Sequence, residues 1–288
     1  MLFYTHSAEH IAKRMSMKKG EFILTKFSDG EIYSRVEENV KGKKVWVLSS
    51  TQAPGDNILE LLFLLDSLQR GGAKVNLMIL YFAYARQDRI VKSGEALSSK
   101  VISDLLGMFK LDTISVVHMH STRIHHFLDF ENLWPIEVFS RIIRRMELIV
   151  APDRGAVSFA RKISDDYRLP VAYMEKFRPE AERVEIRRLT GNVREKKVLI
   201  VDDMITTGHT VIKASQRLIE SGATEVNVMA THGVFSGHAV RNLEESGSIK
   251  SIYVTNSIKP TFKSRMIKTL DISKFVEAKM SKVIVYQE

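Results

Sequence analysis

Hydrophobic and polar positions along the chain fall into two alternating kinds of segment. Short runs rich in β-branched and aliphatic residues, such as VWVLSS (45–50) and VLIVDD (198–203), predict buried strands. After each run, apolar residues recur every three or four positions, at 57–73 and 210–223, which predicts amphipathic helices. Both helical stretches end in glycine and lead into another β-rich run. This order of strand, loop, helix and strand predicts an α/β fold of crossover units with mostly parallel sheets.

The two halves of the chain also resemble each other. KKVWVLSSTQAPGDN (43–57) aligns with KKVLIVDDMITTGHT (196–210), and the two share the Lys-Lys-Val start and the loop glycine, Gly55 over Gly208. The same order of predicted elements follows in each half, which indicates a duplicated α/β domain. The copies differ where the strand meets the loop, because two adjacent serines in the first copy are two adjacent aspartates in the second. This difference predicts that the second loop is specialised for a ligand.

Two adjacent carboxylates, Asp202 and Asp203, end the predicted strand of the second copy. Because like charges at close range disfavour ionisation, we expect a cation or sugar hydroxyls to bind beside them. The next residues offer hydroxyls, a flexible glycine and a helix N-terminus, where N–H groups and the helix dipole favour a phosphate. These residues are Thr206, Thr207, Gly208, His209 and Thr210. The combination predicts a ribose 5-phosphate site, with a plain helix cap at Asp202 as the alternative.

Composition places the chain among ordinary globular proteins. Its 288 residues are 44% hydrophobic and 27% charged, and a chain of this length is expected to form about two domains. No apolar run reaches membrane-spanning length and no secretory signal is visible, so we expect no membrane partner and a cytoplasmic location. The absence of cysteine excludes disulfides, thiolate metal ligands and cysteine nucleophiles.

The charge balance narrows the class of ligand. Lysine and arginine outnumber aspartate and glutamate by 43 to 34, and this excess favours acidic ligands. The basic residues are dispersed apart from short runs such as RIIRR (141–145), and no nucleic-acid-binding signature is present. Small phosphorylated ligands are therefore favoured, and no nucleic-acid partner is expected.

Six motifs together carry a resemblance to a known family. Besides VDDMITTGHT they are FSDGE (27–31), FAYARQD (82–88), APDRGA (151–156), EKFR (175–178) and THGVFSG (231–237). In this order and spacing they resemble the ribose-phosphate pyrophosphokinase family, whose domains have the phosphoribosyltransferase fold. The resemblance implies two similar α/β domains, residues 1–138 with the ATP-side motifs and residues 139–288 with the ribose 5-phosphate loop. It also implies Mg²⁺-dependent transfer of the pyrophosphoryl group of ATP to the anomeric hydroxyl of ribose 5-phosphate.

The resemblance assigns ATP-binding roles to residues of the first half. Phe27, Asp29 and Glu31 would hold the adenine of a neighbouring subunit, which implies a homodimer or a higher homo-oligomer. Arg86, Gln87 and His120 would bind ATP within the chain. From the residues alone, FSDGE is also an ordinary polar turn, and Arg86 with Asp88 is also a surface ion pair that contributes little.

Four histidines lie in SVVHMHSTRIHHF (115–127). A His-x-His pair on a strand puts both rings on one face, so a transition-metal site is one reading of His118 and His120. The resemblance favours a substrate-site role, with His120 at the ATP and magnesium site and His118 where the family has an aspartate. That departure removes a carboxylate beside His120. His125 and His126 are expected to be ordinary loop residues.

The resemblance also assigns the metal and the reacting phosphates. Asp153 would bind Mg²⁺, which accepts a single carboxylate together with phosphate oxygens and waters, although a helix cap is the simpler role for this residue. Arg154 and Ala156 depart from the family pattern at the same loop. Lys176 and Arg178 would stabilise charge on the transferring group as the catalytic residues. Alternation along an extended segment would place them on one face.

Residues 89–99, RIVKSGEALSS, are polar and contain a glycine, which predicts a mobile loop. The resemblance makes this loop a lid that excludes water from the reaction. Two further functions stay open at this stage: a non-catalytic subunit associated with a synthetase, and a phosphoribosyltransferase that consumes phosphoribosyl pyrophosphate. His118 and Arg154 favour the first of these, whereas the second has no use for FAYARQD.

Overall fold

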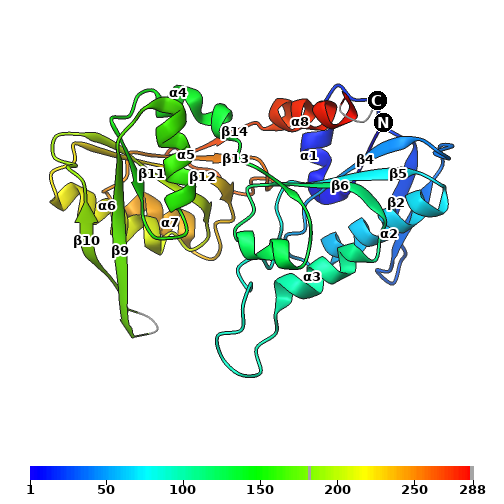
Figure 1. Cartoon of the computed structure of the whole chain (residues 1–288), viewed down its shortest axis with the longest axis horizontal. Helices are drawn as coiled ribbons and strands as arrows, with labels where there is room; N and C mark the ends of the chain where they lie inside the picture. The colour runs from blue at the N-terminus through cyan, green and yellow to red at the C-terminus, as the bar shows by residue number, and fades with distance from the viewer. Residues whose placement is uncertain (181–182, 286–288) are drawn as a thin grey trace. The chain divides into compact units, whose positions relative to one another are not determined.

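The chain forms two compact units in a computed structural model that describes residues 1–180 and 183–285, with side chains for 1–175 and 188–282. Unit 1 comprises Met1–Trp134, Ser257–Lys259 and the segment from Ile272 onward, and unit 2 comprises Pro135–Asn256 and Pro260–Asp271. Each unit contains its own sheet with flanking helices (Figure 1).

Unit 1 is built on a five-stranded parallel sheet with the strand order β1-β4-β5-β6-β7. A separate antiparallel hairpin, β2-β3, lies between β1 and β4 in the sequence. The strands are β1 (Leu2–Tyr4), β2 (Phe22–Lys26), β3 (Ile32–Val36), β4 (Lys44–Ser49), β5 (Lys74–Ile79), β6 (Leu111–Val117) and β7 (Glu131–Leu133). The helices are η1 (His6–Ala8), α1 (Glu9–Ala12), α2 (Asp56–Arg70), α3 (Ser98–Gly107), η2 (Thr122–His126) and α8 (Ser273–Val285).

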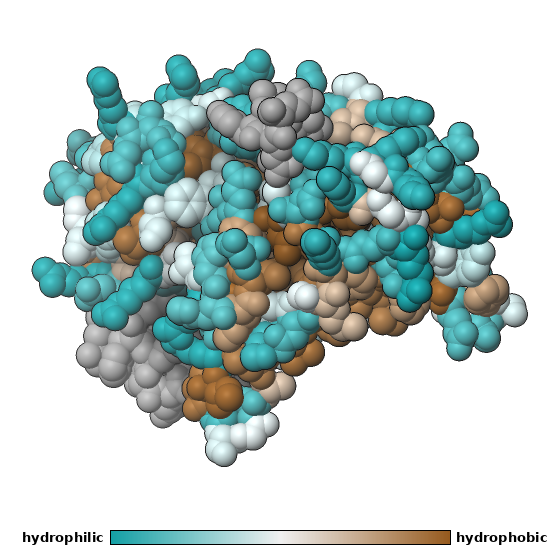
Figure 2. All heavy atoms as spheres, turned by 45° about the vertical axis from the view of Figure 1, so that its right-hand side comes forward, coloured by the Kyte–Doolittle hydropathy of each residue, from teal (hydrophilic) through white to brown (hydrophobic). Residues whose placement is uncertain are grey.

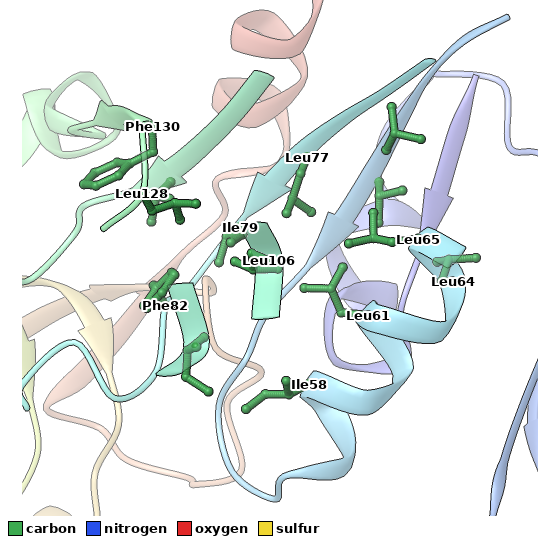
Figure 3. Packing of buried hydrophobic residues seen from close by; sticks show 14 of the residues in the cluster. Ile58, Leu61, Leu64, Leu65, Leu77, Ile79, Phe82, Leu106, Leu128 and Phe130 are labelled. Atoms are coloured by element: carbon green, nitrogen blue, oxygen red, sulfur yellow. The ribbon is translucent and has the colours of Figure 1, made fainter. Parts of the chain in front are cut away.

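Helix α2 packs against one face of this sheet as the apolar spacing of its sequence predicts. Leu61, Leu64, Leu65 and Leu68 are fully buried and belong to one cluster with the valines and isoleucines of β4 and β5 (Figure 3). Full burial of one such leucine contributes about 1.5–3 kcal/mol relative to exposure. Trp46 is also buried but lies outside that cluster, so β4 is covered on both of its faces.

The C-terminal helix α8 belongs to unit 1 although it follows all of unit 2 in the sequence. Glu277 on α8 accepts hydrogen bonds from the backbone N–H of Met17 at 2.8 Å and from the Ser16 hydroxyl at 3.2 Å. The domain division expected at residues 138 and 139 stays a prediction. The packing division differs from it in this last helix, because contacts between the chain ends have no local signal in the sequence.

Unit 2 is built on a seven-stranded sheet with the order β10-β9-β8-β11-β12-β13-β14, in which only the β9-β10 pair is antiparallel. Its strands are β8 (Leu148–Ala151), β9 (Val171–Glu180), β10 (Arg183–Thr190), β11 (Lys197–Ile205), β12 (Glu225–Gly233), β13 (Ser251–Thr255) and β14 (Ile267–Leu270). Its helices are η3 (Ile136–Phe139), α4 (Ser140–Ile143), α5 (Val157–Tyr167), α6 (His209–Glu220) and α7 (Ala239–Glu245). Figure 1 shows α5 on one face of the sheet and α6 with α7 on the other.

The predicted duplication is confirmed by the topology of the two units. The order β1-β4-β5-β6-β7 in unit 1 has the same sequence of connections as β8-β11-β12-β13-β14 in unit 2. The inserted hairpin is separate in unit 1, as β2-β3, and extends the sheet in unit 2, as β9-β10. The predicted fold class, two similar α/β units with mostly parallel sheets flanked by helices, is therefore correct. Among the described helices, none has the length and apolar character needed to cross a bilayer.

Candidate active site

The site in unit 2 lies where the direction of strand connection reverses. The chain leaves β8 through α5 and reaches β9 on one side, and it leaves β11 through α6 and reaches β12 on the other. Since β8 and β11 are parallel neighbours, with Val150 paired to Ile200, their carboxyl ends lie at the same edge. Ligands bind at such reversals because the connections on the two sides leave a crevice there. Asp153 follows β8 and the aspartate pair lies in β11, so the topology brings these acids together.

The aspartate pair is electrostatically costly in the absence of a ligand. Asp202 is half-buried, and the backbone N–H of Asp203 donates to its Oδ1 at 2.9 Å. Burial raises the pKa of Asp202 well above its usual value, and the nearby carboxylates of Asp203 and Asp153 raise it further. Cations or hydroxyl donors would offset this cost, which is the physical requirement expected of a sugar and metal site.

The raised pKa of Asp202 predicts how the stability of the metal-free protein depends on pH. The folded state binds this proton more tightly than the unfolded chain, so Asp202 stabilises the fold below the ordinary carboxyl pKa. That contribution is lost as the pH rises through the raised pKa. We expect Asp202→Asn, which cannot ionise, to unfold at a higher temperature than wild type at alkaline pH, with a difference that shrinks toward acid pH. Thermal scans in a chelator across pH measure this, and a difference independent of pH contradicts it.

The loop after β11 leads directly into helix α6. Gly208 is the N-cap residue and has a φ of +80°, a left-handed conformation that glycine adopts without strain. His209 is the first helical residue, and Thr206, Thr207 and Thr210 flank this turn. Since the cap is Gly208, the alternative in which Asp202 caps the helix does not hold. The five residues predicted to bind the sugar phosphate thus lie at a helix N-terminus, and their role stays a prediction.

Gly208 is expected to be intolerant of a side chain. A Cβ built on it would lie 2.9 Å from Cγ of Leu243 on α7, in addition to the strain of its positive φ. We expect Gly208→Ala to lower the free energy of unfolding by about 1–3 kcal/mol. Gly55 is the matched control, since it aligns with Gly208 but has a φ of −58° and open space around its Cα. Urea denaturation should show about 0.5 kcal/mol or less for Gly55→Ala, and equal losses in the two variants contradict the steric account.

In unit 1 the two serines at the corresponding position form hydrogen bonds with residues that follow β1. Thr5 Oγ1 lies 2.9 Å from the hydroxyls of both Ser7 and Ser49, and Ser7 donates to the carbonyl of Ser50 at 2.7 Å. All four residues are buried. The serine pair of the first copy is therefore committed to internal hydrogen bonds, whereas the second copy has two carboxylates in its place.

Asp153 has a local role as well as a place beside the aspartate pair. Its Oδ1 accepts hydrogen bonds from the N–H groups of Gly155 at 3.0 Å and Ala156 at 3.3 Å, which shapes the turn into α5. The N-cap residue of α5 is Ala156, so Asp153 shapes the turn before the helix and is not its cap, and the metal role stays a prediction. Within the side chains that the structure describes, no group of three or more potential metal ligands comes together. Arg154 is exposed on the same turn.

The FAYARQD loop follows β5 in unit 1 and is joined to the histidine loop. Asp88 accepts a 2.6 Å hydrogen bond from the Ser121 hydroxyl. The alternative from the sequence was a surface ion pair between Arg86 and Asp88, and the described hydrogen bond of Asp88 is instead with Ser121. The carbonyl of Gln87 accepts from both the N–H and the hydroxyl of Ser99, at 3.2 and 2.9 Å. These bonds bring Arg86 and Gln87, both exposed, next to the segment that carries His120.

The histidine segment differs from the expectation of an extended His-x-His pair. β6 ends at Val117, and His118 is buried with a φ of +45°, so strand alternation does not govern His118 and His120. The two-histidine transition-metal site loses its geometric basis for this reason. The backbone N–H of His118 donates a hydrogen bond to the carbonyl of Leu133, and its ring packs edge-on against Trp134. His120 is exposed.

The other two histidines lie against aromatic rings. His125 stacks on Phe130 with a centroid distance of 4.0 Å, and His126 packs edge-on against Phe127. Both histidines belong to η2 rather than to a loop, and their contacts are ordinary packing contacts.

FSDGE forms the exposed tip of the β2-β3 hairpin. Phe27 is 54% exposed, and Asp29 and Glu31 are exposed beside it. Asp29 Oδ1 accepts from the N–H of Glu31 at 3.0 Å, so the polar turn read from the sequence exists as a local structure. A turn that presents an aromatic ring and two carboxylates to solvent is also suited to binding outside its own unit.

Side chains are described for the predicted lid, whereas only the backbone is described for the predicted catalytic pair. In residues 89–97 the Glu95 carboxylate accepts from the N–H groups of Val91 and Lys92, which holds its pKa below the usual value. α3 begins at Ser98, so residues 89–97 of the predicted loop are irregular, whereas Ser98 and Ser99 already belong to the helix; the mobility of the loop stays a prediction. Lys176 and Arg178 belong to β9, but their side chains lie outside the described residues.

One feature of the site was not assigned from the sequence. Three residues other than glycine with positive φ follow parallel strands at their carboxyl ends: Tyr84 after β5, His118 after β6 and Phe235 after β12. Each falls in a motif that the sequence singled out, but backbone strain has no signal in composition or periodicity. THGVFSG in particular carried no residue role.

The fold and the site together define an α/β protein of the phosphoribosyltransferase type, with an acidic pair and a glycine-capped helix N-terminus at the reversal of one sheet. Sequence comparison identifies two family models, the N-terminal domain of ribose phosphate pyrophosphokinase at residues 4–109 and a phosphoribosyl synthetase-associated domain at residues 160–287.

Similar proteins extend over most of the chain. A ribose-phosphate pyrophosphokinase of Corynebacterium ammoniagenes is 37% identical over 259 residues, which cover 87% of this chain and 81% of that protein. The protein of the same name from Bacillus subtilis is 35% identical over 260 residues, covering 88% and 82%. The crystal structure of phosphoribosylpyrophosphate synthetase from Mycobacterium smegmatis matches with a TM-score of 0.86 and 29% identity over 99% of both chains. The chain belongs to the ribose-phosphate pyrophosphokinase family, and the prediction that it is an enzyme of this kind, a transferase of nucleotide biosynthesis, is confirmed.

Proposed function

We propose that the enzyme transfers the pyrophosphoryl group of ATP to the anomeric hydroxyl of ribose 5-phosphate, giving phosphoribosyl pyrophosphate and AMP. The observation that carries the proposal is the acidic pair Asp202 and Asp203 at the sheet reversal, directly before a glycine-capped helix N-terminus. Carboxylates accept hydrogen bonds from vicinal sugar hydroxyls, and the helix N-terminus binds the 5-phosphate. The test is whether AMP release from ATP by the purified chain depends on ribose 5-phosphate, and AMP release that is the same without the sugar would contradict the proposal.

The sugar phosphate is held by one continuous segment in this proposal. Asp202 and Asp203 orient the ribose hydroxyls, and the loop residues bind the phosphate through hydroxyl and backbone N–H groups. The loop residues are Thr206, Thr207, Gly208, His209 and Thr210. Because the acids come from the end of β11 and the N–H groups from the start of α6, both ends of the sugar are fixed by rigid elements.

ATP is bound by residues of unit 1, with Arg86 and Gln87 on its phosphates and His120 beside them. Lys176 and Arg178 neutralise the charge that develops on the transferring group. The anomeric hydroxyl oxygen forms a bond to the β-phosphorus and loses its proton to solvent. The bond from that phosphorus to the α,β-bridging oxygen breaks, and that oxygen leaves on AMP with the electron pair. Such transfers need positioning and charge neutralisation rather than a covalent protein intermediate, which agrees with a chain that lacks cysteine.

Magnesium fits the donor set of the proposed site. Asp153, beside Asp202 and Asp203, would hold the ion through a hard carboxylate oxygen, the kind of ligand that Mg²⁺ prefers together with phosphate oxygens and water. When bound, the ion would neutralise phosphate charge and orient the triphosphate of ATP. Its positive charge would also offset the electrostatic cost of the half-buried aspartates.

Assembly into at least a homodimer is part of the proposal. Exposed apolar residues of unit 1 surround a hollow of about 510 Å³ lined by β3, α2 and α3, and they include Phe63, 41% exposed, and Met108, 76% exposed. Figure 2 shows apolar side chains exposed among charged ones on the face that it presents. A second copy of the chain would remove this surface from water.

A charged side chain introduced at this hollow is expected to break the assembly. We predict that Phe63→Glu shifts the mass measured by light scattering toward that of a single chain. Ile219→Glu is the matched control, because Ile219 is 43% exposed on α6, outside the hollow. The same assembly mass for Phe63→Glu and wild type at micromolar concentration would place the contact elsewhere.

The compartment proposed is the cytoplasm, where ATP and sugar phosphates are available. A non-catalytic subunit of a synthetase is the second candidate function. Two departures from the family pattern favour it: His118, which stands in place of an aspartate two positions before His120, and Arg154. The acidic pair and the phosphate loop favour catalysis, because a subunit without activity has no need to keep them.

A further inference from the structure

The start of the phosphate loop is bonded to the connection that follows the neighbouring strand. β11 and β12 pair in parallel up to Ile205 and Gly233. Beyond that pair the Ile205 carbonyl accepts hydrogen bonds from the N–H groups of both Val234 and Phe235, each at 3.0 Å. The carbonyl of Thr206, the first loop residue, accepts from the N–H of Ser236 at 3.0 Å. The segments that follow β11 and β12 therefore stay hydrogen-bonded to each other after the two strands have ended.

This connection depends on an unusual backbone conformation at Phe235. Its φ is +44°, a left-handed conformation that costs a residue with a Cβ about 1–2 kcal/mol. The strain is offset by packing of the ring. The Phe235 ring meets that of Phe262 edge-on, with centroids 4.8 Å apart, and both pack against the core cluster of unit 2.

The same ring explains a glycine of the motif. A Cβ on Gly233 would lie 2.5 Å from Cε2 of Phe235, so residue 233 must be glycine while the ring lies in this position. Glycine and phenylalanine in THGVFSG thus form one interlocked pair. The packing fixes the turn that delivers the N–H of Ser236 to Thr206.

The C-terminal end of the phosphate loop is contacted by α7, which belongs to the same connection after β12. Leu243 on α7 packs against Gly208, as the 2.9 Å approach to its hypothetical Cβ shows. Residues 234–236 hold the first loop residue and α7 holds the turn into α6. Backbone N–H groups bind a phosphate well only when their directions are fixed before the ligand arrives.

We propose that Phe235 is a positioning residue for the sugar phosphate, acting through the hydrogen bond between Ser236 and Thr206. It touches no substrate in this account. Its ring holds the left-handed turn, the turn holds Thr206, and Thr206 begins the loop that binds the 5-phosphate. The inference rests on the proposed function, since it presumes that ribose 5-phosphate is the ligand of the loop.

The test compares three variants of the full chain. Phe235→Ala removes the ring, and Phe235→Tyr retains it. Phe139→Leu alters a fully buried phenylalanine of unit 2, in η3, as the control for general loss of stability. Calorimetric titration with ribose 5-phosphate and with ATP, below the melting temperature of each variant, gives both affinities. Amide hydrogen exchange of a peptide spanning residues 206–210 reports the loop without any ligand.

We expect Phe235→Ala to weaken ribose 5-phosphate binding about tenfold, with ATP affinity unchanged and with faster exchange in the loop peptide. Phe235→Tyr should restore both readouts, and Phe139→Leu should change neither. Unchanged exchange and unchanged sugar affinity in Phe235→Ala would overturn the inference, as would an equal loss of affinity for both ligands. A wild-type chain that binds ATP but no ribose 5-phosphate would overturn the proposed function, even if Phe235→Ala still changes the exchange of the loop.

Discussion

Replacing Asp203 with alanine is expected to raise the KM for ribose 5-phosphate about 10- to 100-fold, with little change in the KM for ATP. A hydrogen bond to a charged group contributes about 1.5–3 kcal/mol, which corresponds to this range. The loss falls on the sugar because Asp203 lies in β11, four positions before Thr207 of the loop that follows the strand. It falls mainly on KM if the ribose hydroxyls are bound equally in the ground state and the transition state.

Steady-state kinetics with each substrate varied in turn measure this effect. Asp165→Ala is the control, because Asp165 is an exposed aspartate on α5 of the same unit. Asp203→Asn should be intermediate, since the amide oxygen still accepts a hydrogen bond but carries no charge. An unchanged KM for the sugar in Asp203→Ala would remove the acidic pair from the sugar site.

Replacing Lys176 with alanine is expected to lower kcat about 100- to 1,000-fold with smaller changes in both KM values. The proposed reaction concentrates negative charge on the oxygens of the transferring group and on the departing AMP. A fixed cation aimed at charge that develops only in the transition state typically contributes an effect of about this size to kcat. Substrate binding is less affected, because the phosphates also contact other groups.

Two comparisons separate this role from general charge loss. Lys162→Ala removes an exposed lysine of α5 that pairs with Asp166, and it should leave kcat unchanged. Lys176→Arg keeps the charge but changes its geometry, and it should recover only part of the rate. A rise in the KM for ATP with normal kcat would make Lys176 a ground-state binding residue instead of a catalytic one.

Much of the fold could be predicted because the signals are local. Buried strands and amphipathic helices have distinct periods, and the repeat of 43–57 at 196–210 showed that one topology occurs twice. The return of α8 to unit 1 could not be predicted, since it depends on contacts such as Glu277 with Met17 that join opposite ends of the chain. The same holds for the β2-β3 hairpin, which does not join the unit 1 sheet as β9-β10 joins that of unit 2.

The candidate site shows the same division between local and long-range information. The acidic pair and the glycine-capped helix of VDDMITTGHT were readable, because strand end, loop and helix start are consecutive in sequence. The left-handed backbone at His118 was not, and it removes the strand alternation on which the two-histidine reading relied. The link from Phe235 to Thr206 was also hidden, because it joins two loops after different strands.

The most direct test of the central claim is AMP release by the purified chain from ATP and magnesium, with and without ribose 5-phosphate. The sugar product is followed by phosphorus NMR in the same reaction. We expect AMP only when the sugar is present, together with a new diphosphate ester at the anomeric carbon. A folded chain that binds ATP but forms neither product would contradict it and favour the non-catalytic subunit. His118→Asp would then be the first variant to assay.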